Sequence, residues 1–163
     1  MASNGLAPWQ IAVTAPYGPN SKANLVAYAY ALGGGSDVAP TFTTVGVADN
    51  KNSQVFQFSN TRTISPTGHV ATNNGNSSTI TCPAITATDN HSLALLSYSD
   101  GNGLLTGVTW PPSGWTDIST TSTVFKVATR SLLNAGDSTG SVSTPIGGVA
   151  KDFGIINMEI MGM

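Results

Sequence analysis

Glycine and proline divide this chain into runs that are too short for long helices. The 163 residues include 18 glycines and 9 prolines, and both are spread along the whole length. Glycine weakens a helix interior through its backbone entropy, and proline does so through its missing N–H. Turn sequences such as LGGGSD, TNNGN and NAGDSTG recur between the apolar runs. This spacing favours short antiparallel strands.

The apolar residues between these turns recur with a period of two, which is the period of a strand. In HSLALLSYS, two leucines face one way and Ala94, Leu96 and Tyr98 face the other, so both faces of the strand are expected to be covered. Similar alternation predicts strands within QVFQFS, STITCPAIT and STVFKVATR. The final run, DFGIINMEIMGM, places Ile156, Met158 and Ile160 on one side and Asn157 and Glu159 on the other.

The alanine-rich stretch 21–35 has two interpretations. Val26, Tyr28, Tyr30 and Leu32 alternate with small residues, which predicts a strand. The helix propensity of alanine keeps a helix as the alternative.

The surface is expected to be almost uncharged. Charged residues make up 9% of the chain and the net charge is −2, whereas about 25% of residues are charged in average soluble proteins. The basic residues do not cluster, which argues against nucleic-acid binding. Weak repulsion between copies suits a protein packed against neighbours, although threonine-rich β proteins of many kinds share this composition.

We expect an all-β fold, an antiparallel, jelly-roll-like β-sandwich over residues 21–163, preceded by an extended arm over residues 1–20. The prolines and apolar residues of LAPWQIAVTAPYGP favour the arm. Residues 60–78 are polar and loop-like. The arm either reaches a neighbouring subunit or folds back as an edge strand on its own domain. Its candidate partner-interface residues are Pro8, Trp9, Ile11, Val13 and Tyr17.

The stretch TWPPSGW predicts a rigid turn closed by aromatic rings. Pro111 and Pro112 exclude a strand centre, and Trp110 is pushed towards extended geometry. Gly114 is free to take a positive φ and reverse the chain, so that Trp115 begins the return path. We expect Trp115 to be buried at the end of the sandwich. Trp110 either joins it there or lies on the surface as a further partner-interface residue.

One cysteine and two histidines leave little for catalysis, a cofactor or a metal site, and we expect none of these. Cys82 alternates with Ile80 and is expected to be a small buried residue. His69 and His91 have no zinc-ligand spacing, and Glu159 has no paired carboxylate. The chain shows no signal-peptide pattern and no apolar run long enough to span a membrane. An enzyme that depends on the two histidines is kept as an alternative.

Several phrases of the second half resemble a β-sandwich module found in virion proteins of tailed bacteriophages. They are SSTITCPAIT, TWPPSGW, VFKVATR, AGDSTG and FGIINMEIMGM, in that order within residues 77–163. The resemblance implies a structural or attachment role, either as a decoration (cement) protein over capsomers or as a module of a tail or fibre protein. It brings no catalytic residues, and it does not extend to residues 1–76.

We therefore expect a non-enzymatic decoration protein that binds the outer capsid surface and stabilises contacts between capsomers. Its partners would be the major capsid protein and other copies of itself, arranged as a homotrimer. It would be synthesised in the host cytoplasm and located on the exterior of the virion. The alternatives are a tail component and a carbohydrate-binding or host-attachment module, in which Trp110, Tyr98 or Tyr17 would stack on a surface glycan.

Overall fold

The described part of the chain is built from antiparallel strands, which confirms the predicted all-β class. The computed structural model describes residues 10–18, 22–28, 54, 56, 58, 67–100, 108–120 and 125–162. Its strands are β1 (Gln10–Tyr17), β2 (Lys22–Tyr28), β3 (Thr67–Ser77), β4 (Thr79–Cys82), β5 (Ser92–Asp100), β6 (Thr116–Asp117), β7 (Phe125–Leu132), β8 (Val142–Pro145) and β9 (Lys151–Ile160). Within these ranges, no helix is long and apolar enough to cross a membrane.

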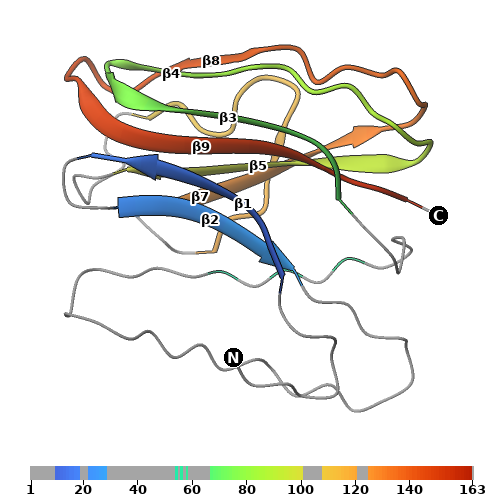
Figure 1. Ribbon diagram of the computed structural model, residues 1–163. Helices are drawn as coiled ribbons and strands as arrows, with labels where there is room; N and C mark the ends of the chain where they lie inside the picture. The colour runs from blue at the N-terminus through green and yellow to red at the C-terminus, as the bar shows by residue number, and fades with distance from the viewer. Residues whose placement is uncertain are drawn as a thin grey trace.

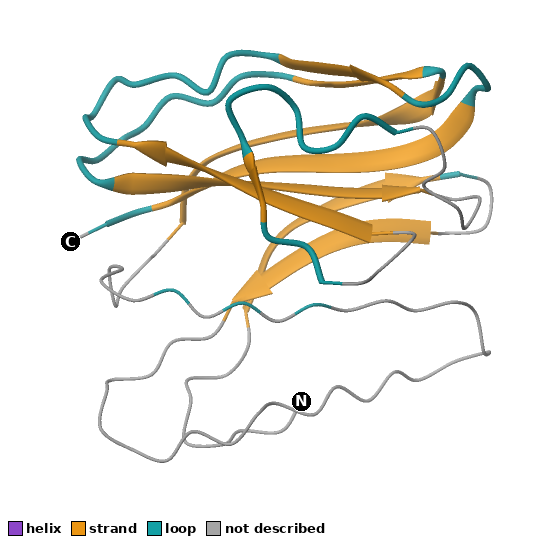
Figure 2. Ribbon diagram, turned by 180° about the vertical axis from the view of Figure 1, so that it is seen from behind, coloured by secondary structure: helices purple, strands orange, loops and turns teal. Residues whose placement is uncertain are grey.

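The strands form three layers, and the middle layer is a central sheet. That sheet has five strands in the order β3-β9-β5-β7-β6. The β4–β8 pair covers one face, and the β1–β2 pair lies against the other (Figure 1). The view from behind shows the same layering (Figure 2). A jelly-roll connectivity stays a prediction. Among the described residues, the layer above the central sheet in Figure 1 contains β4 and β8 alone.

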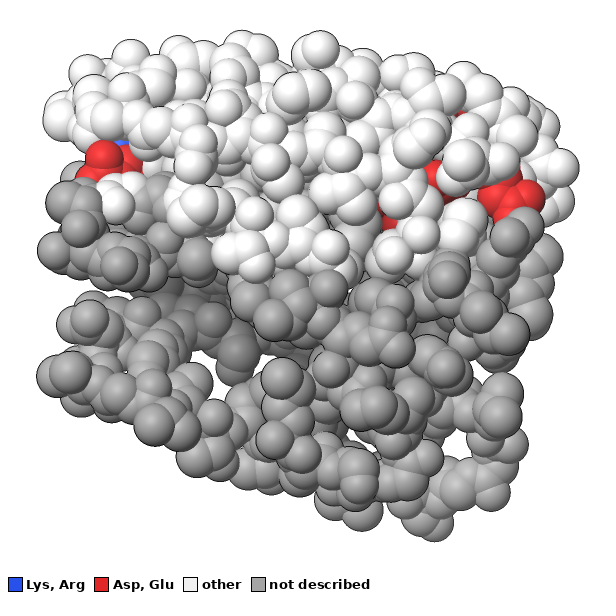
Figure 3. All heavy atoms as spheres, viewed as in Figure 1, with Lys and Arg blue, Asp and Glu red and all other residues white. Residues whose placement is uncertain are grey.

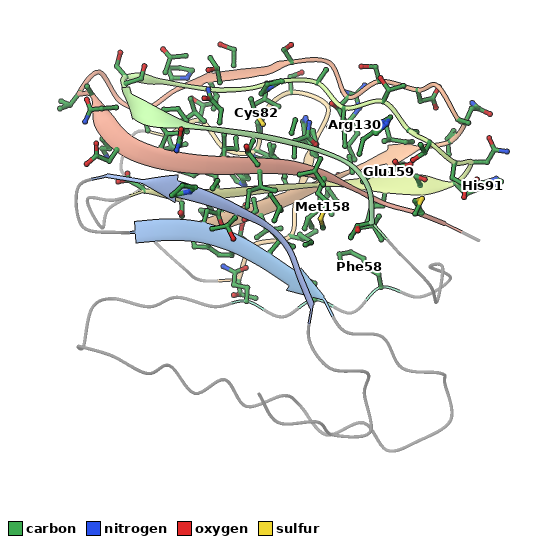
Figure 4. All side chains as sticks on the ribbon, viewed as in Figure 1. Phe58, Cys82, His91, Arg130, Met158 and Glu159 are labelled. Carbon is green, nitrogen blue, oxygen red and sulfur yellow. The ribbon has the colours of Figure 1, made fainter. Side chains whose placement is uncertain are left out.

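Two hydrophobic cores lie on opposite faces of the central sheet. The first is under the β4–β8 layer and includes Ile80, Leu96 and Ile155. The second is against the β1–β2 pair and includes Ala15 and Met158. Figure 4 shows Cys82 above β9, and Met158 and Phe58 below it. The double coverage explains why β5 is buried along almost its whole length, as its sequence predicts.

Strand β9 is also buried on both faces, and the face that carries Phe153 and Ile155 of the first core also carries two polar residues. Ile156, Met158 and Ile160 enter the second core, as their alternation predicts. Asn157 and Glu159 occupy the opposite face, yet each has 0% exposure. The Nδ2 of Asn157 donates to the Pro83 carbonyl at 3.2 Å and to the Thr139 hydroxyl at 3.1 Å. The Glu159 carboxylate accepts from protein donors, so both residues take protein partners in place of water.

A buried asparagine fastens the β1–β2 pair to the central sheet. The Nδ2 of Asn24 donates to the carbonyl of Ser97 at 2.9 Å and to that of Gly154 at 3.3 Å. Its Oδ1 accepts from the Ser97 hydroxyl at 3.0 Å. Since Asn24 is 2% exposed, these bonds are made away from water and fix how the lower layer sits on the sheet.

Three stretches differ from the expectations or resolve them. Residues 67–77, expected to be a loop, form β3, because a strand at the sheet edge does not need an apolar face to pair with β9. Residues 22–28 form a strand and not the alternative helix. Of the strand expected in QVFQFS, Gln54, Phe56 and Phe58 are described and lie outside the strands, and both rings pack on the second core.

Candidate interaction surface

The outer side of the β4–β8 layer is polar but carries no charge. Ile80, Cys82 and Val142 point into the first core. The alternate residues point outward, and we call them the neutral face: Thr79, Thr81, Ser143 and Pro145. Thr81 lies opposite Ser143 in the antiparallel ladder, so hydroxyl groups of neighbouring strands lie side by side.

The segments around the neutral face extend this property. Residues 70–88 and 138–150 contain no Asp, Glu, Lys or Arg, whereas about a quarter of residues are charged in average soluble proteins. In Figure 3 the upper layer is almost wholly uncharged on the side shown, and acidic residues appear near its margins. Depletion of charge is the compositional mark of the centre of a protein interface. The neutral face shares this one mark of a contact surface.

The predicted turn packs its aromatic rings on the first core. Gly114 has φ +81°, and the Trp115 N–H donates to the Pro112 carbonyl at 3.1 Å. Trp115 is buried, as expected. The Trp110–Pro111 peptide bond is cis. Pro111 and Pro112 are half-buried and lie outside the strands.

Trp110 is half-buried and bonded within the molecule. Its ring stacks on Tyr98 with centroids 5.9 Å apart, and its Nε1 donates to the Asp117 carboxylate at 3.2 Å. Burial opposes ionisation of Asp117, but bonds from Ser119 and Trp110 and the charge of Lys126 outweigh it and lower its pKa. The role of Trp110 in a partner interface stays a prediction.

The prediction that Tyr98 is a stacking platform for a sugar is wrong, because Tyr98 is 0% exposed. A platform must present a ring face to the ligand, and this ring is enclosed in the first core.

The arm residues are only partly described. Pro8 and Trp9 lie outside the described residues, as do the side chains of Ile11 and Tyr17. Val13 is half-buried and packs on the second core. Residues 10–17 pair with β2 of the same chain. This agrees with the alternative in which the arm folds back as an edge strand on its own domain. Contact of the arm with a neighbouring subunit stays a prediction.

Glu159 holds together three segments at one end of the molecule. One carboxylate oxygen accepts from the N–H groups of Thr88 at 2.8 Å and Asp89 at 3.3 Å. The other accepts from the His69 N–H at 3.1 Å and from the Thr88 hydroxyl. Burial opposes ionisation, but bonds from Thr88, His69 and Ser92 outweigh it and lower the pKa. With both oxygens occupied, this carboxylate acts as a structural anchor. Figure 4 labels Glu159 among the side chains of the sheet.

The residues considered for chemistry are dispersed. His69 and His91 are both exposed, and the Nδ1 of His69 lies 2.5 Å from the Thr86 carbonyl. Cys82 is 1% exposed, as predicted, and burial raises its pKa to about 12. Within the described ranges, no group of three or more His, Cys, Asp or Glu side chains is placed to hold a metal ion.

No family model, curated protein or solved structure matches this chain. A functional conclusion therefore depends on the chemistry of the surface and on the motif resemblance within residues 77–163.

Proposed function

We propose that this protein is a non-enzymatic structural virion protein, a capsid decoration (cement) protein that binds the outer capsid surface and stabilises contacts between capsomers. The observation that carries the proposal is the neutral face with its uncharged surroundings. The resemblance of residues 77–163 to phage virion modules directs it to a capsid. The proposed partners are the major capsid protein and further copies of the chain, as a homotrimer on the exterior of the virion.

The neutral face suits a persistent contact because little charge has to be desolvated when it is covered. Transferring an unpaired charge out of water is far more unfavourable than transferring a hydroxyl group that finds a hydrogen-bond partner. Threonine and serine hydroxyls both donate and accept, so they adapt to main-chain groups of a partner. Modest contacts of this kind become strong when many are engaged at once on a shell.

The layers behind the neutral face keep it in place. Ile80, Cys82 and Val142 anchor its two strands in the first core, and Ile146 is buried beside them. Thr144 is also buried and donates its hydroxyl hydrogen to the Thr109 carbonyl at 2.9 Å. A preformed surface loses less conformational entropy on binding than a loose one, which favours attachment.

A lysine placed in the neutral face tests the proposal. Purified empty capsids of the virus that encodes the chain are sedimented with the wild type, Ser143→Lys and Ser131→Lys. Ser131 is an exposed serine of β7, outside the neutral face, so its variant is a matched control for the added charge. We expect Ser143→Lys to weaken binding at least about tenfold, because its charge is desolvated, and Ser131→Lys to bind like the wild type.

Two outcomes would refute the proposal: no binding of the wild type, or equal binding of both lysine variants. A tryptophan-fluorescence titration with sugars, run in parallel, identifies the carbohydrate-binding alternative. Because the neutral face has no charges, we also expect capsid binding to change little as the salt concentration rises.

A further inference from the structure

Among the described strands, β3 is a long edge strand of the central sheet. It spans 11 residues, Thr67–Ser77. Among the described strands, β9 is its only ladder partner. An edge strand presents unpaired N–H and C=O groups on its free side, and these groups can hydrogen-bond to another strand. Much of β3 is exposed, including Val70 at 41%.

The usual protections against edge pairing are sparse on β3. Natural edges are shortened, charged, interrupted by proline or bulged. Residues 67–77 contain no Asp, Glu, Lys, Arg or Pro. A register shift occurs between Thr67 and Val70, and the pairing with β9 is regular from Val70 to Ser77. By contrast, the opposite edge strand of the sheet, β6, has two residues.

Three asparagines of β3 are fixed by bonds within the molecule. The Nδ2 of Asn73 donates to the Thr81 carbonyl at 2.8 Å, and that of Asn76 donates to Asp152 at 2.8 Å. The Nδ2 of Asn74 donates to the Pro16 carbonyl. These bonds hold the strand from the layers above and below it, so that a further strand would dock on an edge that is already ordered.

We propose that β3 pairs antiparallel with β3 of a second copy of this chain, which joins two central sheets into one. A twofold axis sets the strand against itself, and a strand without Asp, Glu, Lys or Arg brings no pair of these like charges together in any register. Asparagine, serine and threonine both donate and accept, so they complement their own copies. A net charge of −2 adds little repulsion between the two molecules.

This twofold contact is additional to the homotrimer proposed for the capsid surface, and it uses the main-chain edge of β3, whereas the neutral face is made by outward side chains of β4 and β8. It also supplies a matched pair of variants. Thr72 is exposed on β3 and lies opposite Ile156 of β9 in the ladder, so its side chain shares the lower face of the sheet. Thr72→Lys adds one charge to the edge, and Ser143→Lys adds the same charge to the neutral face.

Sedimentation velocity over a range of protein concentrations tests the pairing. We expect the wild type and Ser143→Lys to form dimers, and Thr72→Lys to raise the dimer Kd at least about tenfold, because each of the two paired edges then carries a positive charge. Circular dichroism and thermal unfolding establish that the variants are folded. A wild type that stays monomeric, or a Thr72→Lys variant that dimerises as well as the wild type, would overturn the proposal.

Hydrogen–deuterium exchange locates the contact without any substitution. The wild type is compared at concentrations below and above its dimer Kd. We expect the amides of residues 67–77 to gain protection at the higher concentration, because their outward N–H groups become hydrogen-bonded. Dimerisation that leaves these amides unchanged and protects another segment would also overturn the proposal.

Discussion

Glu159→Gln isolates the contribution of the buried carboxylate, because the side chain keeps its size while one oxygen becomes an NH2 group. The glutamine amide has two orientations. In the less unfavourable one, its NH2 replaces the Oε2 atom of Glu159, which accepts from the His69 N–H and the Thr88 hydroxyl. The hydroxyl is free to turn and accept, but the His69 N–H loses its acceptor. An unsatisfied buried donor costs about 1–3 kcal/mol, and because the His69 N–H is only part-buried we take the low end, about 1 kcal/mol.

The amides of Thr88 and Asp89 keep an acceptor, but they lose the negative charge. Bonds to charged groups contribute about 1.5–3 kcal/mol, against about 0.5–1.5 kcal/mol for neutral ones, so each bond weakens by about 1 kcal/mol. Together with the unsatisfied His69 donor, we expect a loss of about 3 kcal/mol in the free energy of unfolding. For a chain of this size, that lowers Tm by about 6–12 °C.

Urea unfolding at pH 7, followed by circular dichroism, measures the loss. The control is Asp137→Asn, whose carboxylate accepts from the Leu133 and Asn134 N–H groups at the surface, where water can replace it. We expect the control to lose less than about 1 kcal/mol. Equal losses in the two variants would refute the reasoning that burial makes the Glu159 bonds important.

The effect of pH follows from the lowered pKa of Glu159. The unfolded chain binds a proton more readily at this residue than the folded one does. The stabilisation is therefore present above the unfolded pKa and is lost as the pH falls through the folded pKa. We expect the difference between the wild type and Glu159→Gln to shrink at pH 3. A difference that is the same at both pH values would contradict the assignment.

Three further predictions concern the interior. A Cβ on Gly68 would lie 1.9 Å from the carboxylate of Glu159, so Gly68→Ala should lower the unfolding free energy by about 1–3 kcal/mol, and less than additively with Glu159→Gln; an additive loss in urea unfolding would contradict this. Asn24→Ala should cost about 2–3 kcal/mol and speed hydrogen exchange in β2, because buried groups of the central sheet lose their partner; unchanged exchange would show that Asn24 does not fasten the pair. With its pKa raised to about 12, the Cys82 thiol should react with a disulfide reagent only on unfolding; rapid labelling of the folded protein at pH 8 would contradict its burial.

The fold class was predictable because short alternating runs and turn residues report directly on strands. The alternation in HSLALLSYS predicted the two covered faces of β5, and Gly114 predicted the chain reversal after the prolines. These signals are local. They depend on residue types that a strand or a positive φ requires.

The arrangement of the layers was not predictable, because it depends on contacts distant in sequence. Strand β3 looked like a loop since its residues are polar, yet its asparagines are bonded to β4, β9 and the end of β1. The environment of Glu159 was missed for the same reason. Alternation placed it on a polar side of β9, but its donors come from residues 69 and 88–89.

The neutral face was only partly visible in the sequence. The low overall charge indicated a surface suited to packing, whereas the strand pairing that sets Thr81 beside Ser143 comes from the fold. Uncharged runs at residues 70–88 and 138–150 were available as a signal. They become informative when the fold sets β4 of the first run beside β8 of the second.

Localisation of the protein in purified virions, with its copy number determined by quantitative mass spectrometry and its position by electron microscopy, tests the central claim most directly. We expect many copies distributed over the outside of the head, each with its β4–β8 layer against the shell. Copies confined to the tail, or particles without the protein, would contradict the account.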